Sequence, residues 1–318
     1  MILQEFLVTD QTMSQQPSLK ALDWSLLVLL SVLWGGSFFF SKIALADLPP
    51  LTVVLCRVSL AALALFVYLR ATGQQIPGSR LVWGAFFGMG ILNNIIPFSL
   101  LFWGQTQIAS GLASILNATT PVFAILVTKA LAPDTDVTAH RLAGVALGLG
   151  GVAVLMGGDA ISDRGFPILP MLACLGATLS YGFAGYFGQR FRRMGIAPAI
   201  GAFGQLTASS LLMIPIVALM DKPWTLAAPG LVTVGALLAL ALLSTALAYV
   251  IYFRSLSSIG QLNTSMVTLM IPASAILLGS LVLGERLAMN HYAGLALIGL
   301  GLIAIDGRLW HRLRGASA

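Results

Sequence analysis

Two pairs of adjacent polar residues interrupt long apolar stretches of the chain. Asn93 and Asn94 lie in the middle of one stretch, and Ser244 and Thr245 lie in the middle of another, 151 positions further along. An amide or a hydroxyl that is buried in hydrocarbon without a partner costs several kcal/mol. These side chains must therefore face protein or a water-filled cavity. They are predicted to bind a polar solute, with hydrogen bonds between helices as the alternative.

Aromatic and small polar residues recur near the centres of other apolar stretches. Trp34 and Ser37 lie in the first stretch, Asn117 in the fourth and Tyr181 in the sixth, and Tyr249 follows the second polar pair by one helical turn. The tryptophan and the first tyrosine lie too deep for the aromatic belt of a membrane interface. An aromatic ring beside small residues suits a small amphiphilic ligand such as an amino acid. All five residues are therefore predicted to bind solute, and helix packing is the alternative.

Two charged residues stand out for a different reason. Arg57 lies about 8 residues, or ~11 Å, inside an apolar stretch. A charge within a membrane indicates a function by default, and capture of a solute carboxylate is one interpretation. The favoured interpretation is a structural charge near one end of the helices, paired with Asp47 or Glu285. Glu285 lies at a helix end and is expected to be a second structural charge, as a cap or as part of a gate ion pair.

Several classes of chemistry lack the residues that they need. The middle of every apolar stretch is free of Asp and Glu, so the central carboxylate of proton-coupled cation exporters is missing and neutral or zwitterionic solutes are favoured. The sequence has no GxxxxGK[ST] phosphate loop and no HExxH motif. Cys56 and Cys174 lie inside apolar stretches, which argues against a disulfide or a metal site. We therefore expect no catalytic residues, no metal and no cofactor, and no enzyme activity.

The composition explains why these stretches are so long. Of 318 residues, 58% are hydrophobic and 9% are charged, whereas soluble domains have about 25% charged residues. Most of the surface must therefore face lipid. A membrane-spanning helix needs about 20 mostly apolar residues, and ten stretches qualify, which predicts an all-α integral membrane protein. They cover residues 24–46, 50–70, 81–104, 108–130, 140–158, 167–189, 198–220, 228–253, 262–283 and 290–308.

The basic residues predict how the chain is oriented. With the N-terminus in the cytoplasm, twelve Lys and Arg residues lie inside and four lie outside, as the positive-inside rule requires. The net charge of +6 then reflects membrane topology and not a nucleic-acid partner. Ten spans return the C-terminus to the cytoplasm. The termini are predicted to be a flexible cytoplasmic tail, 1–22, and a basic cytoplasmic tail, 309–318.

The two halves of the chain, 23–158 and 165–308, resemble each other. Aligned at an offset near 150, Pro121 falls on Pro272, Gly144 on Gly294 and Gly151 on Gly301. Five helices are an odd number, so two consecutive copies enter the membrane from opposite sides and form an inverted repeat, as in many secondary transporters. Each matched proline removes a backbone donor and is predicted to be a gate or hinge, with a static bend as the alternative.

Two segments carry a resemblance to a known family. They are "LWGGSFF" from Leu33 and "LVLGERLAMNHYAGLALIGLGL" from Leu281. Together with the repeat and the ten spans, they resemble the EamA-type ten-helix exporters of the drug/metabolite transporter superfamily, which include the YddG amino-acid exporters. The resemblance implies a central cavity lined by the first, third, fourth, sixth, eighth and ninth helices, with the fifth and tenth outside.

These features together predict a transporter. We expect a secondary transporter or facilitator that exports amino acids or similar small metabolites across the bacterial inner membrane by alternating access. The alternatives are an exporter of drugs, sugars or other metabolites with the same fold, and an intramembrane receptor or enzyme. The expected partners are a small-molecule solute, an amino acid above all, and the lipid bilayer. The sequence leaves the oligomeric state open, with a monomer among the options, and also leaves ion coupling open.

Overall fold

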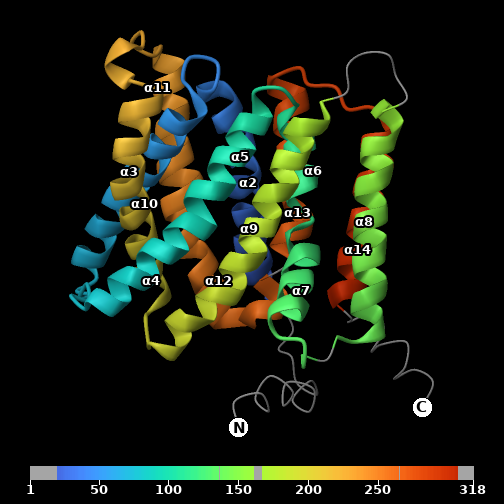
Figure 1. The fold of residues 1–318 in the computed structure, drawn as a ribbon, viewed down its shortest axis with the longest axis horizontal. Helices are drawn as coiled ribbons and strands as arrows, with labels where there is room; N and C mark the ends of the chain where they lie inside the picture. The colour runs from blue at the N-terminus through green and yellow to red at the C-terminus, as the bar shows by residue number, and fades with distance from the viewer. Residues whose placement is uncertain (1–19, 136, 161–166, 265, 307–318) are drawn as a thin grey trace.

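The computed structural model describes residues 20–135, 137–160, 167–264 and 266–306. The secondary-structure elements in these ranges are α, 3-10 and π helices, and no strand occurs in them (Figure 1). The predicted C-terminal tail lies outside the described residues, as does most of the N-terminal tail. Residues 21 and 22, predicted to belong to that tail, are instead the first residues of a helix.

The first half of the chain forms five spans. Two of the five are built from more than one helical element: Arg80–Gln105 runs through α4, η3 and α5, and Ser110–Leu131 runs through α6 and α7. The elements are α2 (Ala21–Ala44), α3 (Pro50–Ala71), α4 (Arg80–Gly90), η3 (Ile91–Ile95), α5 (Ile96–Gln105), α6 (Ser110–Asn117), α7 (Thr120–Leu131) and α8 (Ala139–Ala160).

The second half repeats this order. Its elements are α9 (Ile168–Arg193), α10 (Pro198–Met220), η4 (Pro223–Thr225), α11 (Leu231–Leu238), η5 (Ala239–Leu247), α12 (Ala248–Thr264), α13 (Val267–Val282) and α14 (Met289–Asp306). Eight spans of the described chain are long and apolar enough to cross a membrane, and two shorter apolar helices, Val267–Val282 and Met289–Ile305, complete ten. The prediction of an all-α, ten-helix membrane protein is confirmed.

One predicted boundary is wrong. The eighth span was expected to end at 253 and the ninth to begin at 262, but α12 continues to Thr264 and α13 begins at Val267. Serine side chains in this part of α12 bond to carbonyls of their own helix, from Ser257 to Arg254 at 2.8 Å and from Ser258 to Ser255 at 3.3 Å. A serine that bonds within its helix does not have to interrupt it, so the polar composition did not mark a loop.

Glycines at the contact between α8 and α14 show how the halves are related. A Cβ on Gly144 would lie 2.5 Å from the carbonyl oxygen of Gly301, and a Cβ on Gly151 would lie 2.9 Å from that of Gly294. In the sequence, Gly144 matches Gly294 and Gly151 matches Gly301. Each glycine thus contacts the partner of the other pair, which is the pattern that a two-fold axis produces. The predicted inverted repeat is confirmed.

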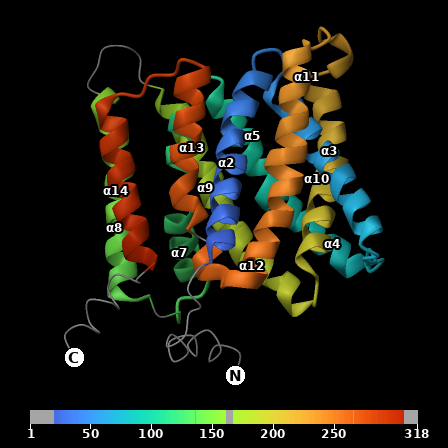
Figure 2. The same ribbon diagram turned by 180° about the vertical axis from the view of Figure 1, so that it is seen from behind.

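The helix pair α8 and α14 stands at one side of the molecule. Figures 1 and 2 show these two helices side by side beyond α7 and α13, with the other spans gathered into one bundle. The fifth and tenth helices therefore lie outside the bundle, as the family resemblance implied.

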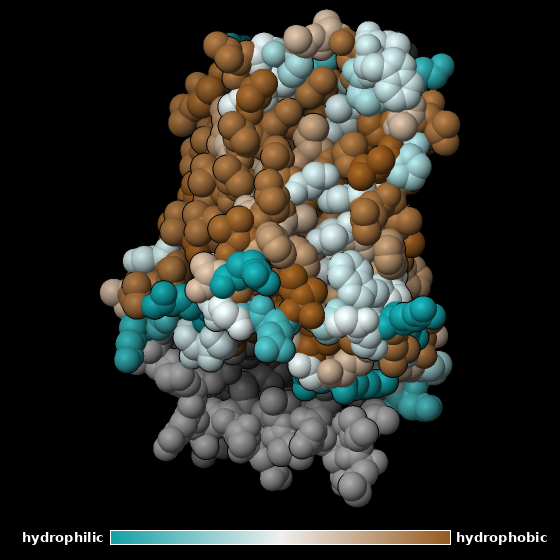
Figure 3. All heavy atoms as spheres, turned by 90° about the vertical axis from the view of Figure 1, so that its left-hand side faces the viewer, coloured by the Kyte–Doolittle hydropathy of each residue, from teal (hydrophilic) through white to brown (hydrophobic). Residues whose placement is uncertain are grey.

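The outer surface suits a bilayer. Figure 3 shows one face on which hydrophobic residues dominate above and hydrophilic residues gather near the lower end. Large apolar side chains of α3 and α10 are exposed, among them Leu63 at 61% and Ile214 at 54%. The lower end, as drawn in Figure 1, carries the start of α4 and the end of α9, with Arg80, Arg190 and Arg193. It is the end that the basic residues predict to be cytoplasmic.

Candidate solute site

Both predicted polar pairs lie in π-helical segments. Asn93 and Asn94 are in η3, and Ser244 and Thr245 are in η5. The Thr245 hydroxyl donates to the carbonyl of Leu240, five residues back, at 2.8 Å. Short π-helical stretches within α-helices frequently occur at functional sites. The two halves thus place a polar pair in the same unusual backbone, which the sequence did not reveal.

Arg57 meets one of these segments from α3. Its Nε donates to the Thr245 hydroxyl oxygen at 3.0 Å, and its guanidinium carbon lies 3.8 Å from the centre of the Phe98 ring, a cation–π contact. The side chain is only 7% exposed. In the described part of the chain, Nε alone has a hydrogen-bond acceptor, and no carboxylate pairs with the guanidinium. The suggested pairing with Asp47 or Glu285 is not found.

The other π segment receives the equivalent residue of α10. Asn93 Nδ2 donates to Gln205 Oε1 at 2.9 Å and lies 3.4 Å from the Tyr249 hydroxyl. In the repeat alignment Gln205 matches Arg57, so each half places this position against the π segment of the other half. Tyr249 and Tyr181 are both close enough to Arg57 to interact with it electrostatically.

These contacts define a buried polar cluster between the two halves. We call it the polar cluster, and it consists of Arg57, Asn93, Tyr181, Gln205, Thr245 and Tyr249. Gln205 and Phe98 were not among the residues predicted to bind solute. Their positions in the repeat, opposite Arg57 and Tyr249, are the signal that identifies them.

Two predicted residues point elsewhere. Asn94 is fully buried, and its Nδ2 donates to Ser209 Oγ of α10 at 3.0 Å. This bond ties two helices together, as the alternative interpretation of the polar pairs proposed. The ring of Trp34 packs against Tyr252, with the ring centres 5.4 Å apart. A chain of ring contacts connects Trp34 with the polar cluster: Tyr252 contacts Phe253, which stacks on Tyr249.

Three further predicted residues have hydrogen-bonding capacity to spare. The Asn117 side-chain oxygen and the Ser244 hydroxyl are buried and have no hydrogen-bond partner, and Ser37 is 8% exposed. Ser244 faces α2, where a Cβ on Gly36 would lie 3.8 Å from its hydroxyl oxygen. Buried polar groups are usually paired, so these atoms are places where a bound molecule could form hydrogen bonds.

The matched prolines have different surroundings. Pro121 is the second residue of α7, directly after a break at Ala118 and Thr119 between α6 and α7. Pro272 lies inside the continuous helix α13. Only the first proline therefore sits at an interruption of its span, and the hinge role of both residues stays a prediction.

Glu285 caps a helix of the other half at the upper end. Its Oε1 accepts the backbone N–H of Ser110 at 2.8 Å and its Oε2 accepts the Ser110 hydroxyl at 2.7 Å, where α6 begins. A carboxylate is favourable at a helix N-terminus because it meets unpaired N–H groups and the positive end of the dipole.

Two aspartates bridge the halves at the same end. Asp221 accepts the N–H and the hydroxyl of Thr52 at 2.8 and 2.7 Å, at the start of α3. Asp47 accepts the Thr233 hydroxyl and the N–H of Gly230, which precedes α11. Those hydrogen bonds hold the pKa of the Asp47 carboxyl below its usual value. Three carboxylate caps thus connect the halves at the upper end.

Both halves of the chain match one family model. The EamA-like transporter family matches residues 23–157 and again residues 168–305. The chain belongs to the EamA-like transporter family. It is therefore a membrane transporter, and its duplicated EamA unit corresponds to the two inverted halves.

The curated relatives of this EamA-like protein are also named as transporters. The uncharacterized transporter YoaV of Bacillus subtilis is 25% identical over 87% of this chain and 94% of its own. The uncharacterized inner membrane transporter YedA of Escherichia coli K12 is 26% identical over 88% of this chain and 89% of its own. A protein of the same strain, named as a probable amino-acid metabolite efflux pump, is 26% identical over 91% and 97%.

A solved structure supports the fold. One crystal structure superposes on this EamA-like chain with a TM-score of 0.63, over 90% of this chain and 96% of its own, at 17% identity. The naming of relatives as inner membrane transporters agrees with the apolar spans, so the protein is a multi-pass inner-membrane transporter. Among the described residues, no group of three or more His, Cys, Asp or Glu side chains could hold a metal ion.

Proposed function

We propose that this transporter exports amino acids or similar small metabolites, and that the polar cluster binds them. The observation that carries the proposal is a buried guanidinium that pairs with no carboxylate of the described residues and is surrounded by neutral polar and aromatic groups from both halves. A similar protein is named as a probable amino-acid metabolite efflux pump. An amino acid supplies the carboxylate that Arg57 lacks.

The chemistry of each group suggests how such a solute is held. A guanidinium binds a carboxylate through strong, charge-assisted hydrogen bonds, often two in parallel. The terminal nitrogens of Arg57 are free to make them, while Thr245 holds Nε. The unpartnered oxygens of Asn117 and Ser244 accept hydrogen bonds from the ammonium group of the solute. This proposal replaces the structural interpretation of Arg57, because no structural counter-ion stands beside it in the described chain.

Alternating access supplies the movement. The three carboxylate caps hold the halves together at the upper end, which is the predicted periplasmic end. Because the halves are inverted copies, an exchange of their packing closes one end as it opens the other. Release of a solute to the periplasm requires the caps to break.

The test is a flux assay with the purified full-length protein in liposomes. Vesicles are loaded with one unlabelled amino acid at a time, and uptake of the labelled form is measured as counterflow. We expect saturable exchange for at least one amino acid and none for its amide, which lacks the carboxylate. Exchange of sugars or cationic drugs, with none for any amino acid, would overturn the substrate proposal. Protein-free vesicles are the control.

A further inference from the structure

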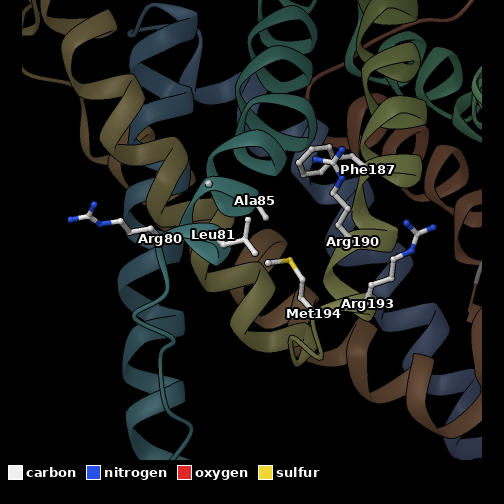
Figure 4. Close-up of a pocket in the computed structure, with 8 residues that line it drawn as sticks. Arg80, Leu81, Ala85, Phe187, Arg190, Arg193 and Met194 are labelled. Carbon is white, nitrogen blue, oxygen red and sulfur yellow. The ribbon is translucent and has the colours of Figure 1, made fainter.

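A crevice separates the lower ends of α4 and α9. Its volume is about 490 Å³, and none of its residues belongs to the polar cluster. Figure 4 shows it between the start of α4 and the end of α9. Its lining residues are Arg80, Leu81, Gly84, Ala85, Phe187, Arg190, Arg193 and Met194.

The crevice lies where two packed helices diverge. Higher up, α9 touches the third span directly, because the Ser180 hydroxyl donates to the Leu92 carbonyl at 2.7 Å. Below that point Phe187 packs so closely on α4 that a Cβ on Gly88 would lie 2.6 Å from its ring. Towards the lower end the contact is lost: nothing lies within 4 Å of a Cβ on Gly84, and Leu81 is 76% exposed. The crevice therefore opens towards the surroundings of the protein.

The walls and the rim differ in chemistry. Leu81, Ala85 and Met194 face into the crevice, and the guanidinium groups of Arg80 and Arg193 extend away to opposite sides (Figure 4). The third arginine, Arg190, lies over the Phe187 ring with 4.6 Å between its guanidinium carbon and the ring centre. Within the part of the chain that the structure describes, none of these three arginines forms an ion pair. An apolar crevice is thus edged by three uncompensated positive charges.

The depth of the crevice matches that of lipid headgroups. The indole N–H of Trp83, at the start of α4, donates to the Pro77 carbonyl at 2.9 Å. Tryptophan is enriched at membrane interfaces, where its ring lies at the level of the headgroups. The position of Trp83 at the start of α4 thus agrees with arginines that lie near the lipid phosphates and apolar walls that lie near the first acyl carbons.

We propose that this crevice binds one anionic phospholipid. Its acyl chain fills the space between α4 and α9, and its phosphate lies at the rim, where the side chains of Arg80, Arg190 and Arg193 turn in to reach it. Basic pockets between transmembrane helices on the cytoplasmic side are suited to such headgroups, and guanidinium matches phosphate geometry. A free phosphate ion would bind the arginines but would leave the apolar walls of the crevice in contact with water. The bound lipid holds the lower ends of α4 and α9 apart. It thereby contacts the two spans that carry Asn93 and Tyr181 of the polar cluster.

The binding test uses the full-length protein in a neutral detergent. Thermal unfolding is followed as phosphatidylglycerol is titrated in, and the same titration is made with phosphatidylcholine of identical acyl chains and with inorganic phosphate. We expect a saturable rise in the melting temperature with phosphatidylglycerol only. Equal shifts with both lipids, or a shift with inorganic phosphate, would overturn the proposal.

Variants separate the two parts of the site. R80Q combined with R190Q should weaken phosphatidylglycerol binding about 30-fold. Each arginine near an anionic lipid surface contributes about 1 kcal/mol, and a loss of about 2 kcal/mol corresponds to that change in affinity. R141Q combined with R254Q removes two exposed basic residues outside the crevice and should leave binding unchanged. Gly84→Leu puts a side chain into the crevice, where nothing lies within 4 Å of the added Cβ, and should reduce the shift while the melting temperature without lipid does not fall. Unchanged binding in both the arginine and the leucine variant would contradict the proposal.

Discussion

At the scale of single residues, Arg57 is the group on which solute recognition depends. It is buried, its Nε is held by Thr245, and a ring lies against its face. A buried charge of this kind is costly unless something compensates it. An incoming carboxylate gives that compensation only while solute is bound, so the site favours anionic groups over neutral ones.

Replacement of this arginine tests the point. Arg57→Gln mimics the residue that the second half has at the same place and should reduce counterflow of an amino acid at least ~10-fold, since a hydrogen bond to a charged group contributes about 1.5–3 kcal/mol. Arg57→Lys, which keeps the charge but not the fork of donors, should retain part of the flux. Arg70→Gln, at the exposed end of α3, is the matched control. Full activity of Arg57→Gln would return Arg57 to a structural role.

Asp47 gives a prediction for pH. Its pKa is lowered in the folded protein by the Thr233 hydroxyl and the Gly230 N–H, so the ionised form is favoured by folding. A group whose pKa is depressed contributes stability above its unfolded pKa and loses that contribution as the pH falls through the folded value. The melting temperatures of the wild type and Asp47→Asn should therefore differ by a constant amount above about pH 5 and converge below about pH 4. A difference that already vanishes near neutral pH would contradict this assignment.

At the scale of helices, the contact of α8 with α14 depends on missing side chains. A Cβ on Gly151 would lie 2.9 Å from a backbone oxygen of α14, whereas a Cβ on Gly150 would meet nothing within 4 Å. Small residues allow such close approach between membrane helices. The pair α8 and α14 lies outside the bundle, so it is expected to serve as a scaffold more than as a wall of the solute path.

Adjacent glycines make a controlled experiment. Gly151→Ala should lower stability by about 1–3 kcal/mol because the added methyl forces the helices apart. Gly150→Ala should be neutral or slightly stabilising, since alanine is the better helix former. Thermal unfolding in detergent measures both. Equal melting temperatures for the two variants would show that the helices separate at no cost, against the geometry of this contact.

At the scale of the whole molecule, three carboxylates join the inverted halves at one end. Each reaches the N-terminus of a helix in the opposite half: Glu285 that of α6, Asp221 that of α3 and Asp47 that of α11. The residue that matches Glu285 in the first half, Asp134, is exposed and makes no hydrogen bond within the described residues. The caps therefore distinguish the two ends of an otherwise symmetric molecule.

Neutralising one cap should shift the conformational balance. Glu285→Gln loses the charge at the start of α6 and should raise the accessibility of the bundle interior from the upper end several-fold. The measurement is the labelling rate of Ser37→Cys by a membrane-impermeant maleimide, in a protein in which Cys56 and Cys174 are replaced by alanine. Asp134→Asn is the repeat-related control and should leave the rate unchanged. A labelling rate that rises equally in both variants would contradict the proposal that the Glu285 cap keeps the upper end closed.

Much of the architecture was determined by the sequence alone. The number of spans, their inverted duplication and the glycines of the α8–α14 contact all follow from local patterns, because the length of an apolar stretch and its hydrogen bonding are properties of one segment. The matched positions also identified both polar pairs and, through the repeat, the equivalence of Arg57 with Gln205. The predicted end of the eighth span was wrong, because polar residues within a helix look like a loop when only composition is considered.

Only the tertiary structure decided which polar residues meet. Neighbouring residues of an α-helix point about 100° apart. A π-helical segment turns by a smaller angle per residue, so it rotates the direction in which the residues after it point. Asn93 consequently faces Gln205 and Tyr249, while Asn94 faces Ser209 of α10. The partner of Arg57 was likewise open, since Thr245 lies 188 positions away in the chain. The sequence determined that polar groups lie at this depth, and the rotation and packing of the helices decided which of them form one site.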